Sequence, residues 1–245
     1  MSKQNRESNR AEKAAAIRAD QARKERNKRV AIVAGILVVL GAIVAAGAWY
    51  SSDDTAPGDN SSVEVAIGDG SVLVGKTTAP VKVVVYEDFL CPYCRELEDS
   101  TREFLRENAA KGKVQVEYRP INLLTQTTYS ARALNAWAAV LKNASPNAAL
   151  KLHDLFYENQ PYEGSADKTT DADIAKLVTK AGGDNAAVRK AMKTQDTAFF
   201  AAASQAMTDQ GIQGTPTVFV DGKELTGSSI GDLVSQIENA VDNGS

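Results

Sequence analysis

The chain has 245 residues, of which 43% are hydrophobic and 24% are charged. This composition is typical of a globular protein and excludes a fibrous or wholly disordered one. Residues 1–29 are strongly basic, whereas the whole chain has a net charge of −3, so the rest of the chain is acidic. An acidic body argues against nucleic-acid binding, because neutralising phosphates requires a basic face. With 2 cysteines in all, a multi-disulfide scaffold and an all-cysteine zinc site are excluded.

Residues 30–50 form a stretch without any charged side chain. At about 1.5 Å per residue, a helix of this length spans roughly 30 Å, the thickness of the bilayer hydrocarbon. Its basic flank predicts a cytoplasmic tail at residues 1–29, a single-pass membrane anchor at residues 30–50 and an extracytoplasmic body. The alternative is a cleaved signal peptide with residues 46–48 (Ala-Gly-Ala) as its cleavage site, although both its basic and its apolar part would be unusually long.

An extracytoplasmic linker is predicted at residues 51–70, because residues 51–62 are small, polar and acidic. Alternating valines and isoleucine on both sides of Asp69-Gly70 nevertheless predict a short β-hairpin here. The β-branched run at residues 81–86 is typical of a central strand that is buried on both faces.

The next elements alternate between helix and strand. A helix is predicted from Pro92 to Gly112, because proline suits the first helical turn and the apolar stripe continues to the glycine. Residues 114–123 predict a second strand. From about residue 125 to residue 211 the apolar period is helical, with caps at Ser145 and Thr170.

Strand signals return at residues 217–225, which predict a hairpin around Asp221-Gly222, and Ser229 caps a last helix. The order of these elements predicts an α/β domain at residues 71–245, interrupted by a helical insertion at about residues 125–211.

The strongest chemical signal is the motif Cys91-Pro92-Tyr93-Cys94, placed where a strand passes into a helix. The first thiol faces the free N–H groups and the positive dipole of the helix start, which stabilise a thiolate, so we expect Cys91 to be exposed and reactive. The second thiol lies one turn further in, and we expect Cys94 to be shielded and to release a trapped substrate by attacking Cys91. This division of labour is what a disulfide enzyme needs.

Three other interpretations of the cysteine pair are weaker. A zinc site needs two more ligands, yet there is no other cysteine and His153 is the only histidine. A structural disulfide between such close residues would constrain almost no loop and would add little stability. An inert buried pair does not fit the position at a strand-to-helix junction. We therefore expect redox catalysis by the cysteines themselves, without a metal or a cofactor.

A second motif, Gly214-Thr215-Pro216-Thr217, precedes the strand TVFV, where an ordinary strand start is the simplest interpretation. The whole pattern of strand, CPYC, helix, helical insertion, GTPTVFVDG and final helix resembles the DsbA-like branch of the thioredoxin superfamily, in its membrane-anchored Gram-positive or actinobacterial form. The resemblance covers residues 71–245 and implies a thioredoxin-like fold with a helical insertion domain. It also implies that Pro216 is cis and faces Cys91, and that the backbone at Thr215 pairs with the substrate as an added strand.

The resemblance further implies an extracytoplasmic thiol–disulfide oxidoreductase that introduces disulfides into exported proteins through Cys91 and Cys94. A quinone-linked membrane partner of the DsbB or VKOR type would reoxidise it, and we expect a monomer. One departure is Tyr93, which stands where strong oxidants of the family carry a histidine. CPYC with Thr215 also occurs in DsbG-like isomerases and reductases, although residues 51–70 are too short for their dimerisation domain. A DsbG-like activity and a chaperone-like holdase therefore remain as alternatives.

Two acidic residues and the histidine have less specific predictions. Glu87 and Asp88 precede the cysteine motif and either exchange a proton with Cys94 or form a solvated strand end. His153 is expected to be a surface or packed histidine, because no second ligand or nucleophile is near it in the sequence.

Overall fold

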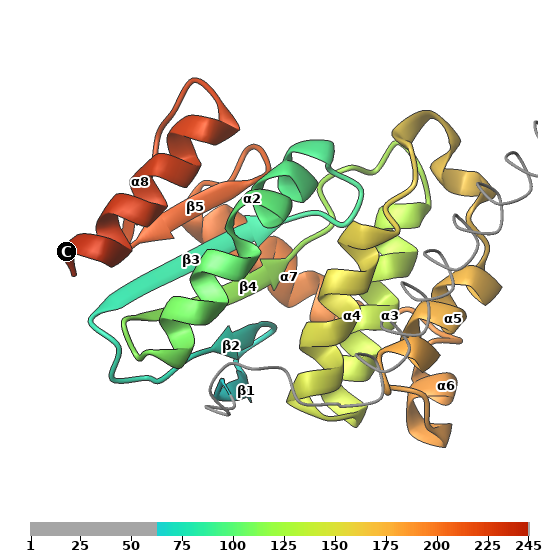
Figure 1. The fold of residues 1–245 in the computed structure, drawn as a ribbon. Coiled ribbons are helices and arrows are strands. Elements are labelled where there is room, and N and C mark those ends of the chain that lie inside the picture. The colour runs from blue at the N-terminus through green and yellow to red at the C-terminus, as the bar shows by residue number, and fades with distance from the viewer. Residues whose placement is uncertain (1–62, 245) are drawn as a thin grey trace, which may run out of the picture. The chain divides into compact units, whose positions relative to one another are not determined.

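The computed structural model describes residues 63–244, and its centre is a 6-stranded sheet in the order β1-β2-β4-β3-β5-β6 (Figure 1). The two long central strands, β3 and β4, run parallel, and every other pairing is antiparallel. The strands are β1 (Val65–Ile67), β2 (Val72–Val74), β3 (Val81–Glu87), β4 (Val114–Pro120), β5 (Thr217–Val220) and β6 (Lys223–Glu224).

The predicted central strand is confirmed as β3, which lies between β4 and β5. On one face of the sheet Val81, Val83 and Val85 are buried, whereas on the other face Lys82 and Val84 are only half-buried, so the expected burial on both faces is met only in part. The hairpin of β1 and β2 is confirmed as well. It pairs with β4, so the sheet begins inside the range 51–70 that was expected to be linker.

The predicted strand at residues 114–123 is too long, because β4 ends at Pro120. Pro120 has no N–H to donate to a sheet ladder, and its partner on β3, Glu87, is the last residue of that strand. The N–H of Ile121 makes one last bond to the carbonyl oxygen of Glu87, and the chain then leaves the sheet.

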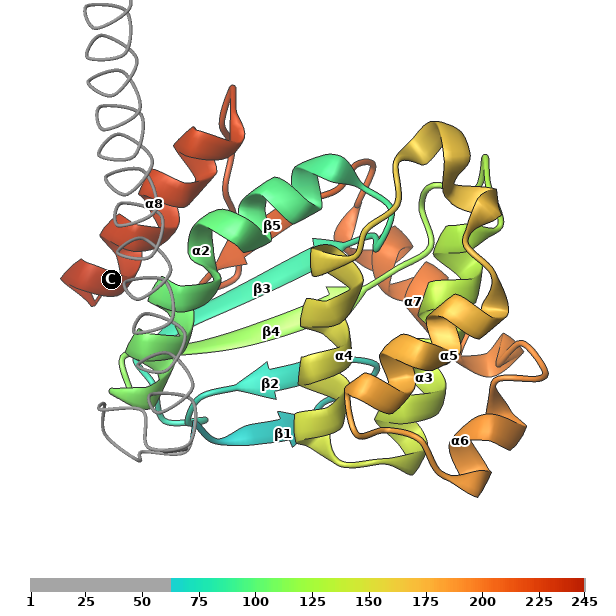
Figure 2. The same cartoon turned by 45° about the vertical axis from the view of Figure 1, so that its right-hand side comes forward.

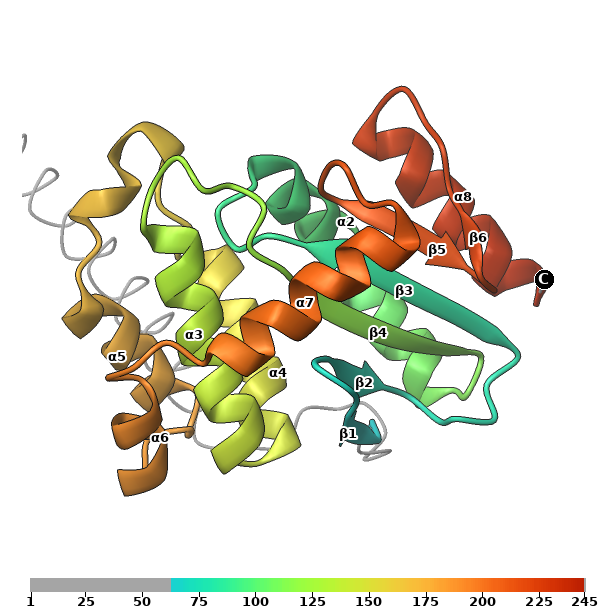
Figure 3. The same cartoon turned by 180° about the vertical axis from the view of Figure 1, so that it is seen from behind.

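Helices cover both faces of the sheet. The predicted helix after the cysteine motif is α2 (Pro92–Ala110), which packs beside α8 (Ile230–Asn243) on one face (Figure 1). Helix α7 (Thr197–Gln210) crosses the other face, as the view from behind shows (Figure 3). The predicted cap at Ser229 is confirmed as a capping box with Asp232.

The helical insertion lies beyond the carboxyl ends of β3 and β4, where α4 also contacts β1 (Figure 2). Its centre is the pair α3 and α4, in which Trp137 and Phe156 are fully buried. The caps predicted at Ser145 and Thr170 begin α4 and α5. The insertion comprises α3 (Tyr129–Asn143), α4 (Pro146–Glu158), the short η1 (Glu163–Lys168), α5 (Asp171–Lys180) and α6 (Ala186–Ala191), and α7 follows it.

The tail predicted at residues 1–29 and the membrane anchor predicted at residues 30–50 lie outside the described residues. Among the helices of residues 63–244, none combines the length and the apolar character that crossing a membrane requires.

Candidate active site

The cysteine motif lies where β3 ends and α2 begins. Cys91 is the N-cap residue of α2, with an extended backbone (φ −71°, ψ 118°), and Pro92 occupies the first turn, where its missing N–H costs nothing. Both cysteines are free thiols, so the structure describes the dithiol form. The sulfur of Cys91 therefore lies at the start of the helix, as predicted.

Cys91 is less accessible than expected, because its side chain is only 5% exposed. The segment that precedes β5 covers it, and the Cys91 thiol donates a hydrogen bond to the carbonyl oxygen of Thr215 at 3.2 Å. The Thr215–Pro216 peptide bond is cis, as the resemblance implied. The fold thus brings together the two motifs that the sequence separates.

The environment of Cys91 favours its thiolate. A hydrogen bond from the Cys94 thiol is the main reason why the pKa of Cys91 falls from its usual value to about 6, against the opposing effect of burial. The Thr215 side chain and the backbone N–H groups of Cys94 and Tyr93 stabilise the thiolate further. The helix start contributes as predicted, but its contribution is smaller than that of the neighbouring thiol.

Cys94 has the opposite character. Its side chain is 1% exposed, and burial raises its pKa well above the usual range, with further contributions from Cys91 and from the charge of Glu87. The prediction that the second thiol is shielded is therefore confirmed. The two sulfurs differ in the way that nucleophilic attack followed by resolution requires.

Asp88 is not a solvated strand end, because it is fully buried and holds the turn before the cysteines. Its carboxylate accepts hydrogen bonds from the backbone N–H groups of Leu90, Leu123 and Leu124 at 2.8 to 2.9 Å. The Ser130 hydroxyl donates to it at 2.7 Å. A carboxylate with four donors ties the active-site turn to the chain after β4 and to α3.

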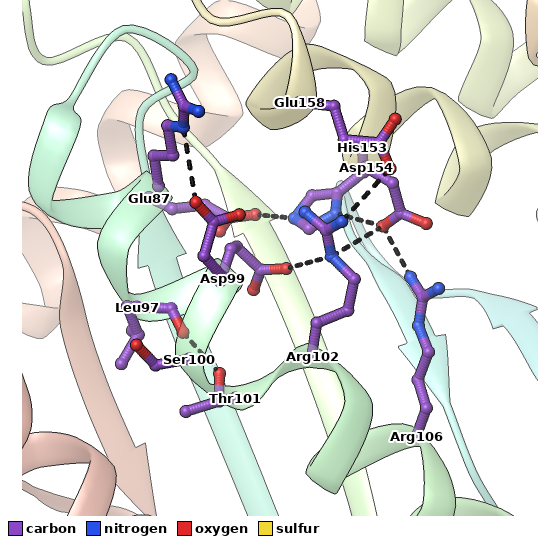
Figure 4. Close-up of polar contacts among 12 residues, drawn as sticks. Glu87, Leu97, Asp99, Ser100, Thr101, Arg102, Arg106, His153, Asp154 and Glu158 are labelled. Carbon is purple, nitrogen blue, oxygen red and sulfur yellow. Dashed lines mark hydrogen bonds and ion pairs between the residues drawn. The ribbon is translucent and has the colours of Figure 1, made fainter. Parts of the chain in front are cut away.

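Glu87 is also fully buried, which contradicts the solvated alternative for it. Its Oε1 lies 2.6 Å from Nε2 of His153, a residue of α4 (Figure 4). Of the two expectations for His153, a surface or a packed side chain, the packed one is confirmed, because the residue is fully buried. Its Nδ1 lies 3.2 Å from Asp154. Burial opposes a charged imidazole, yet the charges of Glu87 and Glu98 outweigh it and raise the pKa of His153 to about 10. Sequence reasoning missed this ion pair, because its partners lie on different elements.

A shallow cleft of about 330 Å³ adjoins the cysteine motif, and sequence reasoning missed its residues too. Gln160, from the segment after α4, lines it and donates from Nε2 to the carbonyl oxygens of Phe89 at 3.1 Å and of Cys91 at 3.0 Å. Tyr162 also lines it and is 80% exposed, and Tyr93 is 61% exposed. Two large, exposed aromatic rings close to a reactive thiol are a surface on which a protein partner can dock.

Solved structures with this fold include two actinobacterial proteins. DsbA from Mycobacterium tuberculosis, in its reduced form, is 23% identical and superimposes with a TM-score of 0.58, over 71% of this chain and 97% of that one. The MdbA protein from Corynebacterium diphtheriae, a thiol-disulfide oxidoreductase, is 24% identical with a TM-score of 0.60, over 80% of this chain and 98% of that one. These similarities show that the chain has the DsbA-type fold, with its helical insertion.

Among curated relatives, the serine/threonine-protein kinase PknE from Mycobacterium tuberculosis is 28% identical over 137 residues, which are 52% of this chain. The match spans only 24% of the length of that kinase. Disulfide bond formation protein D from Bacillus subtilis is 27% identical over 163 residues, which are 64% of this chain and 70% of that protein.

The family model described as thioredoxin matches residues 68–239, which include both sequence motifs and the helical insertion. Together with a nucleophilic thiol at a helix start, a shielded second thiol and a cis-proline segment over the first, this match identifies the chain as a member of the thioredoxin family, with the fold of the DsbA-type thiol–disulfide oxidoreductases.

Proposed function

We propose that the protein is an extracytoplasmic thiol–disulfide oxidoreductase that introduces disulfides into exported proteins. The observation that carries this proposal is the contrast between the two thiols. Hydrogen bonding lowers the pKa of Cys91 to about 6, whereas burial raises that of Cys94. A thiolate that is stabilised in the reduced form makes the corresponding disulfide a better oxidant.

The reaction begins with the Cys91–Cys94 disulfide. A substrate thiolate attacks the sulfur of Cys91, a mixed disulfide forms, and Cys94 leaves as a thiolate that takes up a proton. A second substrate thiolate then attacks the substrate sulfur of the mixed disulfide, so that the substrate gains its disulfide and Cys91 leaves as a stable thiolate. Two electrons pass in total from the substrate dithiol to the enzyme, and of the two substrate protons one ends on Cys94 and the other is released to solvent.

The backbone around Thr215 supports the binding of an extended substrate. The Thr215 carbonyl oxygen already accepts a hydrogen bond from Cys91, and the neighbouring main chain can pair with a substrate strand in a sequence-tolerant way. Tyr93, in the cysteine motif, and Tyr162, in the cleft beside Pro92, are exposed rings that can add apolar contacts. These features suit a substrate that is still unfolded.

The test uses the oxidised soluble body and a reduced, unfolded ribonuclease with several cysteines. We expect enzyme-dependent recovery of ribonuclease activity, none with Cys91→Ser, and accumulation of a mixed disulfide on Cys91 with Cys94→Ser. Activity on scrambled but not on reduced ribonuclease would favour the DsbG-like isomerase. Suppression of aggregation by the Cys91→Ser variant, without any disulfide exchange in the wild type, would favour a holdase.

The location and the reoxidising partner belong to the same proposal. The basic residues 1–29 and the uncharged residues 30–50 support a single-pass anchor that holds the catalytic body outside the cytoplasm. A quinone-linked membrane protein of the DsbB or VKOR type would then regenerate the disulfide of the monomeric enzyme. Protease added to cells with a permeabilised wall should digest the body, and protection of the body until lysis would contradict this topology.

A further inference from the structure

On the face of the sheet that α7 crosses, the structure contains a cavity of about 480 Å³ that the proposed reaction does not use. It lies between α7, the ends of β3 and β4, the end of α3 and the turn that joins β1 to β2 (Figure 3). Its volume falls in the range of roughly 300 to 1,000 Å³ that is typical of small-molecule sites. The residues that line it belong neither to the cysteine motif nor to the cis-proline segment, so this cavity is separate from the active site.

The sequence of α7 explains why space remains between this helix and the sheet. The side chains that α7 contributes to the lining are mostly methyl groups, and they recur at the spacing of one helix face. These residues are Ala198, Ala202, Ala203 and Ala206. Protein interiors are normally packed to the density of an organic crystal by larger side chains. A face of alanines fills less of the space above a sheet, and a hollow is the result.

The rest of the lining is largely apolar and aromatic. The buried ring of Phe199 lines the cavity from α7, and the ring of Tyr86 lines it from β3. Ile67, at the end of β1, also lines it and is 41% exposed although its side chain is large and apolar. The turn that follows Ile67 approaches α7 closely, because a Cβ atom at Gly70 would lie 3.7 Å from the Phe199 ring. The cavity is therefore apolar, and this turn bounds it.

Two cations line the cavity, and each lies over one of its aromatic rings. The Arg119 guanidinium is 6.0 Å from the centre of the Tyr86 ring. The Nζ of Lys142 is 5.4 Å from the centre of the Phe199 ring. Arg119 also donates a hydrogen bond to the carbonyl oxygen of Asp69 at 3.1 Å. Contact with a ring attracts a cation to one position without using all of its N–H donors.

The charge of the lining is positive, although the body of the protein is acidic. Arg119 pairs with Glu117 at 2.7 Å, and Lys142 pairs with Asp196 at 2.5 Å, but these acids are not part of the lining. Among the described residues that form the lining, the one carboxylate belongs to Asp69, which is exposed on the turn. Each cation keeps further N–H donors, because guanidinium and ammonium groups have several. An apolar cavity with two such cations is complementary to a ligand with an apolar body and one negative head group.

We propose that this cavity binds a medium-chain fatty acid, with its carboxylate at Arg119 and Lys142 and its alkyl chain under α7. A guanidinium suits a carboxylate, because it can donate two parallel N–H bonds to the two oxygens. The alanine face suits the alkyl chain, because the burial of each methylene group is favourable. The inference goes beyond the proposed thiol–disulfide exchange and does not depend on it.

The experiment uses the full chain in lipid nanodiscs and, as the probe, octanoate with a photoreactive diazirine on its chain. Illumination links the bound probe to the residues beside it, and peptide mass spectrometry identifies them. Unlabelled octanoate, butyrate and octanol then compete with the probe. Each competitor is measured in the aqueous phase, so that its partition into the lipid does not affect the comparison.

We expect saturable labelling of α7 and of residues 67–70. Octanoate should displace the probe at a concentration at least about tenfold lower than butyrate, because each buried methylene tightens binding by up to about fourfold. Octanol should need at least about fivefold more than octanoate, because a hydroxyl lacks the charge that strengthens hydrogen bonds from the two cations.

A substitution that fills the cavity tests where the ligand binds. Ala203→Leu enlarges a side chain of the lining and should weaken octanoate binding by at least about tenfold. The matched control is Ala201→Leu, the same change at an exposed residue of α7 outside the lining, which should bind octanoate as the wild type does. Alkylation of Cys91 at the wild-type rate confirms that each variant is folded.

A second variant tests the charge and carries the test if Ala203→Leu does not fold. Arg119→Gln/Lys142→Gln should lose the preference for octanoate over octanol and keep the affinity for octanol. Its control is Lys111→Gln, because Lys111 is also an exposed lysine paired with an acid but lies on α2. This control should keep the preference.

Four results would overturn the inference without affecting the function proposed for the two cysteines. Labelling that does not saturate, or that lies only outside the cavity, would show that the cavity binds no fatty acid. Equal competition by octanol and octanoate would assign the cavity to a neutral apolar ligand. Wild-type binding by Ala203→Leu would place octanoate elsewhere. Labelling that appears only when the protein is diluted would assign the cavity to a second copy of this chain.

Discussion

The ionisation of Cys91 offers a quantitative test, because the structure identifies the groups that stabilise its thiolate. With a pKa of about 6, Cys91 is about 90% thiolate at pH 7, whereas at the free value of about 8.5 it would be about 3% thiolate. The hydrogen bond from Cys94 is the largest favourable contribution, and the Thr215 side chain is the next. Substitutions at these two positions should therefore raise the pKa of Cys91 in that order.

Thr215→Val removes the hydroxyl and keeps the shape of the side chain. A hydrogen bond to a charged group contributes about 1.5 to 3 kcal/mol, so its loss should raise the pKa of Cys91 by roughly one to two units. Cys94→Ala should raise it at least as far. At pH 5, where the thiolate is the minor form, alkylation of the Thr215→Val variant should be at least about tenfold slower than that of the wild type.

The assay measures the rate of iodoacetamide labelling from pH 4 to pH 10 on the reduced protein, with peptide mass spectrometry to assign each label. Cys94 should remain unlabelled in the wild type, because it is buried. Thr208→Val is the matched control, since this hydroxyl bonds only within α7. A wild-type midpoint near the free value of about 8.5, or unchanged midpoints in both variants, would refute the assignment of these hydrogen bonds.

Three further predictions concern stability and redox potential. Because the pKa of Cys91 is lowered in the folded protein, the reduced protein should gain stability relative to the oxidised protein as the pH rises from 6 to 8, and lose that stability as the pH falls through 6. The expected change is about 1 to 2 kcal/mol, since Cys91 has partial solvent access. Melting curves of the two forms that move in parallel with pH would contradict this. Asp88→Asn should lower the free energy of unfolding in urea by about 3 kcal/mol, because an amide nitrogen cannot accept the backbone and Ser130 hydrogen bonds. A loss below about 1 kcal/mol would show that Asp88 does not stabilise the turn. The reduction potential of the wild type should lie between roughly −270 and −120 mV. Tyr93→His should make the enzyme more oxidising, since an imidazolium at this exposed position stabilises the Cys91 thiolate. A potential of the variant that a glutathione titration finds unchanged would argue against this effect of residue 93.

Local signals were sufficient to predict most of the helices and strands, because the cap, proline or apolar pattern that determines each one lies within or next to it in the sequence. Pro92 starts α2, and Ser229 starts α8. The strand prediction at residues 114–123 failed for a local reason too. The apolar pattern continues past Pro120, but Pro120 has no N–H for a ladder bond and lies opposite Glu87, where β3 ends.

The parts of the site that the sequence could not show depend on contacts between distant elements. Cys91 was expected to be exposed, yet the segment that buries it lies 124 residues further along the chain. His153 was expected to be a surface or packed histidine, and its ion pair with Glu87 was missed because Glu87 precedes it by 66 residues. The local sequence held one signal for this ion pair. His153 adjoins Asp154 in an otherwise apolar part of a predicted helix, and a buried histidine needs polar or acidic partners.

The helical insertion packs directly against the turn that carries Cys91, and so forms part of the active site. The ring of Phe89, in the turn before Cys91, packs against Trp137, Phe156 and Tyr157 of the insertion. Gln160 binds the carbonyl oxygens on both sides of that turn. Any hinge motion that moved the insertion away from β3 would therefore break these hydrogen bonds and separate His153 from Glu87.

The cost of such a separation would be high. It would expose three aromatic contacts and leave the Glu87 carboxylate without its cation beneath Cys94. The turn, β3 and α4 should thus open only together, with amide protons that exchange at a common rate. The difference between a Cys91 with a lowered pKa and a shielded Cys94 is thus a property of the closed fold.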